Sequence, residues 1–114
     1  MPSFAQRKYR EKVYQNLWCK NYGGLSEYVL FDNTRVDCLL QNYAVEFDFA
    51  NKWAEAIGQS LYYSIITRKR AGVVLIMENE ECDEKYLARL KKVAKIYGIT
   101  VWTVTSKYIE QNCN

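Results

Sequence analysis

The 114-residue sequence contains no histidine. Mechanisms that need a histidine base, alone or paired with serine or cysteine, are therefore excluded within this chain. Any catalysis must use carboxylates, lysine, tyrosine, cysteine or a bound metal ion. Proline occurs once and glycine five times, which leaves little room for linkers. No apolar run approaches the roughly 20 residues that span a bilayer, and the N-terminus shows no apolar stretch typical of a signal peptide.

The composition is that of one folded domain, which we place at residues 1–114. Hydrophobic residues make up 49% and charged residues 25% of the chain, enough to bury one modest core. The net charge of +3 is a mild bias toward anionic partners. The four cysteines form no CxxC pair, and without histidine they argue against a zinc site. We predict that the protein is cytoplasmic and that its cysteines are reduced thiols, namely Cys19, Cys38, Cys82 and Cys113.

The order of helical and strand patterns predicts an α/β protein. A basic helix is expected at 3–21, with Ser3 as N-cap and an apolar stripe formed by Phe4, Tyr9, Val13 and Leu17, to which Cys19 can be added. Strands are then expected at 27–31, 35–40, 43–49, 73–77 and 99–104. Helices are expected at about 50–67 and at 84–97, the second capped by Asp83. The first three strands should form an antiparallel meander and the last two should be parallel. A mixed sheet with helices on both faces follows.

Acidic residues interrupt two of these apolar strands. Side chains alternate along a strand, so Glu46 and Asp48 share one face of 43–49. Asp37 lies between Val36 and Cys38, which should both face away from it. Asp37 is expected to share the face of Glu46 if 35–40 pairs with 43–49 through their short turn. Gathered carboxylates repel one another unless one is protonated or a cation is bound. Hard oxygen ligands suit Mg²⁺ or Mn²⁺, although single acids at a strand end are also common on solvated surfaces.

The helix after this strand carries a polar stripe. Lys52, Glu55, Gln59 and Tyr63 follow helical spacing beside an apolar stripe that would pack on the sheet. Lys52 is only a turn from the carboxylates, where a lysine can hold an attacking water or stabilise phosphate charge. Further along, the basic segment 67–70 reads either as a solvated loop or as a contact for a phosphate backbone.

Three segments, "RVDCL", "AVEFDFANKWAEAIGQSLYY" and "GVVLI", resemble the PD-(D/E)xK nuclease superfamily, which includes restriction enzymes and Holliday-junction resolvases. The resemblance covers about residues 24–104. It implies a restriction-endonuclease-like αβββαβ core with a further αβ unit. It also implies that Asp37 and Glu46 bind Mg²⁺ or Mn²⁺, with Asp48 and Glu27 as additional acids. "QSLYY" is similar to the QxxxY element of RecB-like and lambda-exonuclease-like members, which gives Gln59 and Tyr63.

One position departs from the family pattern. Where the signature has lysine, this chain has Asp48, and Lys52 stands where a lysine that has moved to the following helix would project. The resemblance therefore implies a metal-dependent nuclease acting on nucleic acid, most often DNA, with Asp37, Glu46, Lys52, Gln59 and Tyr63 in its active site. Small nucleases of this kind often work as homodimers. The alternative is a non-catalytic module on the same fold that binds nucleic acid or protein.

Overall fold

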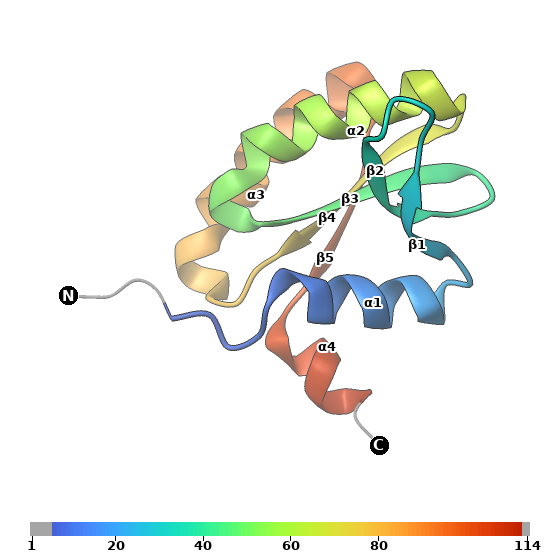
Figure 1. The fold of residues 1–114 in the computed structure, drawn as a ribbon. Coiled ribbons are helices and arrows are strands. Elements are labelled where there is room, and N and C mark those ends of the chain that lie inside the picture. Colours follow the sequence, from blue (N-terminus) through green and yellow to red (C-terminus); the bar gives the residue numbers. More distant parts are fainter. Residues whose placement is uncertain (1–5, 113–114) are drawn as a thin grey trace.

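The computed structural model of this chain describes residues 6–112. Figure 1 shows a twisted sheet with helices packed against it. The elements follow one another as α1 Glu11–Asn21, β1 Leu25–Val29, β2 Arg35–Leu39, β3 Tyr43–Phe49, the short 3₁₀ helix η1 Ala50–Lys52, α2 Trp53–Thr67, β4 Arg70–Ile76, α3 Glu80–Tyr97, β5 Thr100–Val104 and α4 Ser106–Gln111.

The five strands form one mixed sheet in the order β1-β2-β3-β4-β5. β1, β2 and β3 pair antiparallel. β3 pairs parallel with β4, and β4 pairs parallel with β5. Helices α2 and α3 provide the two crossovers that parallel strands require. The predicted antiparallel meander and the parallel last pair are both confirmed.

The sheet is covered on both faces, as predicted. Helices α1 and α4 lie on one face, and α2 and α3 lie on the other (Figure 1). Because side chains alternate along each strand, β3 and β4 supply residues to two separate cores. The core under α1 and α4 includes Tyr14, Trp18, Phe47, Val74, Ile76 and Ile109. The core under α2 and α3 includes Ala56, Ala71, Val73, Leu75, Leu87 and Leu90.

The first helix begins later than predicted. Residues 6–10 are not helical, and Arg10, in extended conformation, precedes the first helical residue. The backbone N–H groups of Lys8 and Tyr9 instead donate to the Glu78 carboxylate, at 3.2 and 3.1 Å. These long-range bonds satisfy donors that helix formation would otherwise use, so the segment stays outside the helix. The predicted start at Ser3, like Phe4, lies outside the described residues.

The buried face of α1 matches the predicted stripe only in part: Leu17 and Cys19 pack in the core under α1 and α4, but Val13 does not. Val13 is 40% exposed, whereas the side chains that face the sheet are Tyr14, Gln15, Trp18 and Cys19. The Trp18 ring makes edge contacts with the rings of Phe47 and Trp102. Large aromatic rings remove more apolar surface from water than Val13 does, so they orient the helix.

Several other boundaries move for local reasons. β1 lies two residues earlier than predicted, at Leu25–Val29, and β4 begins at Arg70 because this residue pairs with Tyr43 of β3. The N-cap of α3 is Asn79, whose side chain accepts the N–H of Cys82 at 3.3 Å; Asp83, the predicted cap, lies inside the helix. The short helix α4 was not predicted; its N-cap is Thr105.

The prediction of reduced cysteines is wrong for Cys19 and Cys38. These residues form a disulfide between α1 and β2, with their Cα atoms 5.7 Å apart. Their separation of 19 positions carries no spacing signal, because the pairing depends on how α1 docks on the sheet. Cys82 is free and exposed, while Cys113 lies outside the described residues. No helix among residues 6–112 is long and apolar enough to cross a membrane.

We expect the disulfide to make a large contribution to stability. Closing a loop of this length restricts the unfolded chain, which stabilises the fold by about 2–4 kcal/mol. Reduction, or the Cys19→Ser/Cys38→Ser variant, should lower the free energy of unfolding by that amount in urea titrations. Cys82→Ser is the matched control and should change it by less than about 0.5 kcal/mol. Equal stability of the oxidised and reduced protein would contradict this expectation.

Candidate functional site

The strands β2 and β3 separate at a pair of carboxylates. Their ladder contains the pairs Cys38↔Val45 and Leu39↔Ala44, and the next step places Asp37 opposite Glu46. There the carboxylates of Asp37 and Glu46, and not the backbone of the neighbouring strand, accept the backbone N–H groups. The Asp37 N–H donates to Glu46 Oε2 at 3.0 Å, and the Phe47 N–H donates to Asp37 Oδ2 at 2.8 Å. The two acids therefore lie together, as the sequence predicted.

Burial makes this pair electrostatically costly. Glu46 is only 2% exposed. Burial, reinforced by the nearby charge of Asp37, raises the pKa of Glu46 to about 9. Burial also raises the pKa of Asp37 to about 7, although the Phe47 N–H partly offsets this rise. At neutral pH the pair thus retains a proton or needs a cation in its place.

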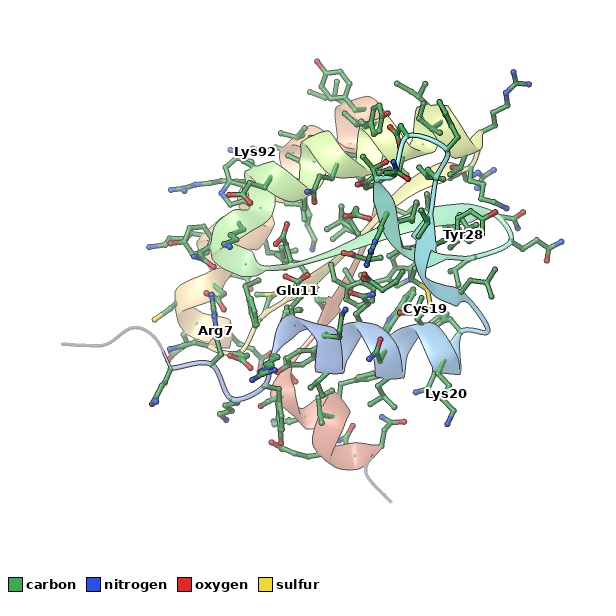
Figure 2. The ribbon with its side chains drawn as sticks, viewed as in Figure 1. Arg7, Glu11, Cys19, Lys20, Tyr28 and Lys92 are labelled. Carbon is green, nitrogen blue, oxygen red and sulfur yellow. A yellow bond between two sulfur atoms is a disulfide. The ribbon has the colours of Figure 1, made fainter. Side chains whose placement is uncertain are left out.

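Two further acids extend the site. Asp48, 6% exposed, shares the face of β3 that carries Glu46. Burial raises the pKa of Asp48 to about 7, with added repulsion from Glu11 and Glu55. Glu11 begins α1 and projects from its sheet-facing side (Figure 2). Burial raises its pKa as well. Sequence reasoning missed Glu11 because the predicted helix phase placed this residue on a basic, solvated surface.

Glu27 joins the group from β1 through an unusual backbone conformation. It lies within the strand and has φ = 56°. A non-glycine residue in this left-handed region is uncommon and often marks a functional position. Opposite it, β2 turns over at Asp37: Val36 packs with the α2 side of the sheet and Cys38 with the α1 side. The expectation that Val36 and Cys38 share a face is therefore wrong.

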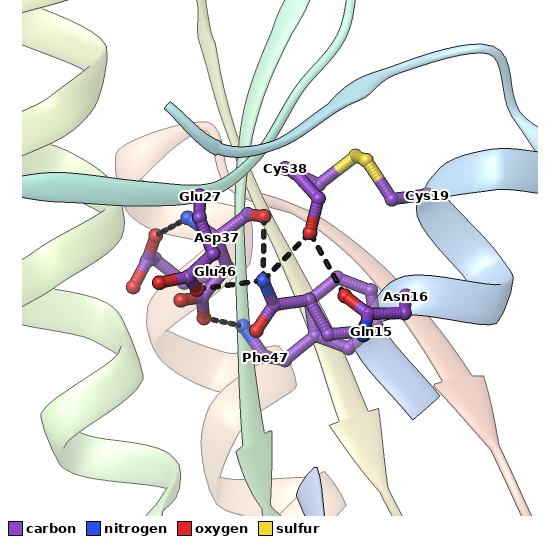
Figure 3. The surroundings of a disulfide bond; sticks show 9 residues. Gln15, Asn16, Cys19, Glu27, Asp37, Cys38, Glu46 and Phe47 are labelled. Carbon is purple, nitrogen blue, oxygen red and sulfur yellow. Dashed lines mark hydrogen bonds between the residues drawn. A yellow bond between two sulfur atoms is a disulfide. The ribbon is translucent and has the colours of Figure 1, made fainter. Parts of the chain in front are cut away.

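A buried amide fixes the acids from the α1 side. Gln15 is 2% exposed, and its Nε2 donates to Glu27 Oε2 at 2.7 Å, to the Asp37 carbonyl at 2.9 Å and to Ser26 Oγ at 3.0 Å (Figure 3). The hydrogen bond from Gln15 to Glu27, together with the charges of Lys12 and Arg35, lowers the pKa of Glu27. Sequence reasoning missed Gln15, since a lone glutamine in a polar helix carries no signal of burial.

Helix α2 borders the same site. Tyr63 is 8% exposed and packs with Val36 and Ala44. Burial and the nearby Glu46 charge raise the pKa of its hydroxyl. Lys52 is exposed. Its positive charge offsets part of the rise in the pKa values of Asp48 and Glu11, so its ammonium lies near these acids. Gln59 is exposed, and within residues 6–112 it forms no hydrogen bond to the carboxylates.

The donor set fits a hard divalent cation in its chemistry. Glu46 supplies a buried carboxyl group and Asp37 a half-buried one, and in the described part of the chain no cationic side chain forms an ion pair with either. Mg²⁺ commonly takes one or two carboxylates and keeps several waters. Among residues 6–112, however, no three His, Cys, Asp or Glu side chains form a ready-made metal cage. Asp37 and Glu46 are therefore the residues that would hold the ion, with Asp48, Glu11 and Glu27 around them.

Comparison with protein-family models, with characterised proteins and with solved structures found no match to this chain.

The raised pKa values predict how metal-free stability changes with pH. An acid whose pKa is higher in the folded state stabilises the fold fully below its unfolded value, 4.5 for glutamate, and loses that contribution as the pH rises through the folded value. In EDTA, the free energy of unfolding should therefore fall between about pH 5 and 9. Glu46→Gln should flatten this fall and stabilise the protein at pH 9 by roughly 2 kcal/mol or more, because one pKa unit corresponds to about 1.4 kcal/mol.

The control for this measurement is Glu55→Gln, which removes an exposed carboxylate on the neighbouring helix. Urea titrations at four or five pH values would give the three curves. The wild-type and Glu55→Gln curves should run parallel, with Glu46→Gln alone flatter. A Glu46→Gln curve parallel to that of the wild type would show that the buried glutamate is not the source of the pH dependence.

Proposed function

We propose that this protein is a metal-dependent nuclease that hydrolyses phosphodiester bonds in nucleic acid, with DNA as its substrate. The observation that carries the proposal is the Asp37–Glu46 pair, whose pKa values burial raises and with which no cationic side chain of residues 6–112 forms an ion pair. Buried groups of this kind, in which one partner needs a proton or a metal, are typical of functional sites.

The arrangement of the acids on the sheet supports the proposal. A second strand that carries Asp37 and a third that carries Glu46, both antiparallel, are followed by a helix and a parallel strand. This is the order of the restriction-endonuclease-like core that the sequence resembles. In the proposed site Asp37 and Glu46 hold Mg²⁺ or Mn²⁺, and Asp48 and Glu27 assist, as the resemblance implies. Glu11, found only in the structure, joins them. A bound divalent ion supplies a water of lowered pKa and offsets charge on the scissile phosphate.

The side chains of α2 have distinct roles in this proposal. Lys52 is exposed beside Asp48, so its ammonium can orient the attacking water or stabilise the charge that develops on the phosphate. Tyr63 supports the site from the buried side, next to Glu46. Gln59 faces solvent, where its amide would contact the substrate phosphate. A homodimer, also implied by the resemblance, would grip a duplex on both sides.

One observation favours a second candidate, a non-catalytic nucleic-acid-binding or protein-interaction module. The family position for lysine is occupied by Asp48, and the ammonium of Lys52 forms no ion pair with Asp37, Glu46 or Asp48 within residues 6–112. A module that only binds would keep its affinity in EDTA. A nuclease would lose all cleavage under the same condition.

Cleavage of labelled DNA tests the proposal directly. Single-stranded, duplex and branched DNA, with RNA for comparison, would be incubated with the protein in Mg²⁺ or Mn²⁺ and in EDTA. We expect cleavage that requires the ion and that falls at least about a hundredfold in Glu46→Gln and in Lys52→Ala, because each removes a group placed at the developing charge.

Lys91→Ala, an exposed charge change on α3, is the control and should cleave like the wild type. Cleavage that survives EDTA or the Glu46→Gln change would refute the assigned site. If no substrate is cut while DNA still binds in EDTA, the non-catalytic module is the correct assignment.

A further inference from the structure

A hollow of about 470 Å³ lies at the other end of β3 from Asp48. Two connections form it, the turn between β2 and β3 and the link between α2 and β4. Its walls are formed by Gln41, Asn42, Thr67, Arg68, Lys69 and Arg70. None of these residues belongs to the carboxylate site, so the hollow is a separate feature of the surface.

Hydrogen bonds between the two connections hold the hollow open in a fixed shape. The Arg70 N–H donates to the Asn42 carbonyl at 2.9 Å, and Lys69 Nζ donates to the Gln41 carbonyl. Ser64 Oγ of α2 donates to the Lys69 carbonyl at 2.6 Å. The chain turns at Arg68 in the left-handed conformation, φ = 59°, which ends the helix. A site fixed in this way loses little entropy when a ligand binds.

The hollow concentrates positive charge. Arg68, Lys69 and Arg70 are consecutive, and in the described part of the chain no carboxylate forms an ion pair with any of them. Cations at the end of α2 also complement its C-terminal carbonyls, but Arg70 belongs to β4 and lies beyond that helix end. Three uncompensated cations around one concavity favour an anion inside it.

We propose that this hollow binds a phosphate group of a nucleic-acid backbone, away from the carboxylates. Guanidinium groups match the oxygens of a phosphate in a bidentate fork, and the Gln41 and Asn42 side chains add amide donors at the rim. The assignment to a nucleic acid, as opposed to free phosphate, rests on the proposed function.

The spacing along β3 is consistent with one substrate that occupies both places. Tyr43 pairs with Arg70 at the edge of the hollow, and Glu46 follows three positions later on the same strand. At about 3.3 Å per residue this is a separation of roughly 10 Å. A separation this short lets neighbouring phosphates of one nucleic-acid strand reach both the hollow and the carboxylates.

Binding measured without cleavage tests this inference independently of catalysis. Fluorescence anisotropy of a labelled 16-mer duplex would be followed in EDTA, over a range of salt concentrations. Arg68→Ala/Arg70→Ala should weaken binding about tenfold and reduce the slope of log K against log salt by about 1, the loss of one phosphate contact. Both residues are exposed, so folding should be retained, which a thermal melt would verify.

The matched control is Lys91→Ala/Lys92→Ala, which removes the same charge from exposed positions of α3. It should weaken binding less than about twofold. Equal losses in the two double variants, or no loss in either, would overturn the inference. A loss specific to Arg68→Ala/Arg70→Ala would sustain it even if no substrate were ever cut, which separates its outcome from that of the nuclease proposal.

Inorganic phosphate distinguishes the two sources of the ligand. In wild-type protein, phosphate should shift the backbone amide NMR signals of Asn42 and Lys69, and the duplex should displace it. Absence of any shift would overturn the binding site itself. Shifts that the duplex cannot reverse would show that the hollow takes free phosphate, which would overturn its assignment to a nucleic-acid backbone.

Discussion

The site is built around two carboxyl groups that face each other across β2 and β3, the buried Glu46 and the half-buried Asp37. Where β2 leaves β3, each acid accepts a backbone N–H that the sheet no longer satisfies. The bonds fix both side chains, while burial raises both pKa values. Apolar residues at these positions would leave the two N–H groups without partners, whereas two ionised acids repel each other. A proton or a cation resolves this conflict.

The surroundings hold this strained arrangement in place from the α1 side. The disulfide fixes β2 to α1 at Cys38, directly beside Asp37. Gln15, one helical turn before Cys19, holds Glu27 in its left-handed conformation and also bonds the Asp37 carbonyl. Local conflicts with packing and propensity that converge on one place are typical of functional sites, where stability is lost in favour of activity.

Much of the fold was predictable because it depends on local patterns. The alternation in β3, the apolar run in β4 and the short turn before Tyr43 determine the strand order and bring Asp37 to Glu46. Three features were not predictable: the disulfide, the burial of Gln15 and the position of Glu11 near the other acids. They depend on how α1 packs on the sheet, which no local sequence pattern determines. The helical period alone would extend α1 back to residue 3, but the Glu78 carboxylate binds the backbone of Lys8 and Tyr9 instead.

In the proposed site, a divalent cation takes the place of the proton that the Asp37–Glu46 pair holds. Calorimetric titration of the protein with Mn²⁺ at pH 7, in buffers of different ionisation enthalpy, counts the protons released on binding. Since ligands must be deprotonated before they bind a metal, we expect saturable binding with release of about one proton and tighter binding at higher pH. Binding without proton release, or binding that Glu46→Gln leaves unchanged, would contradict it.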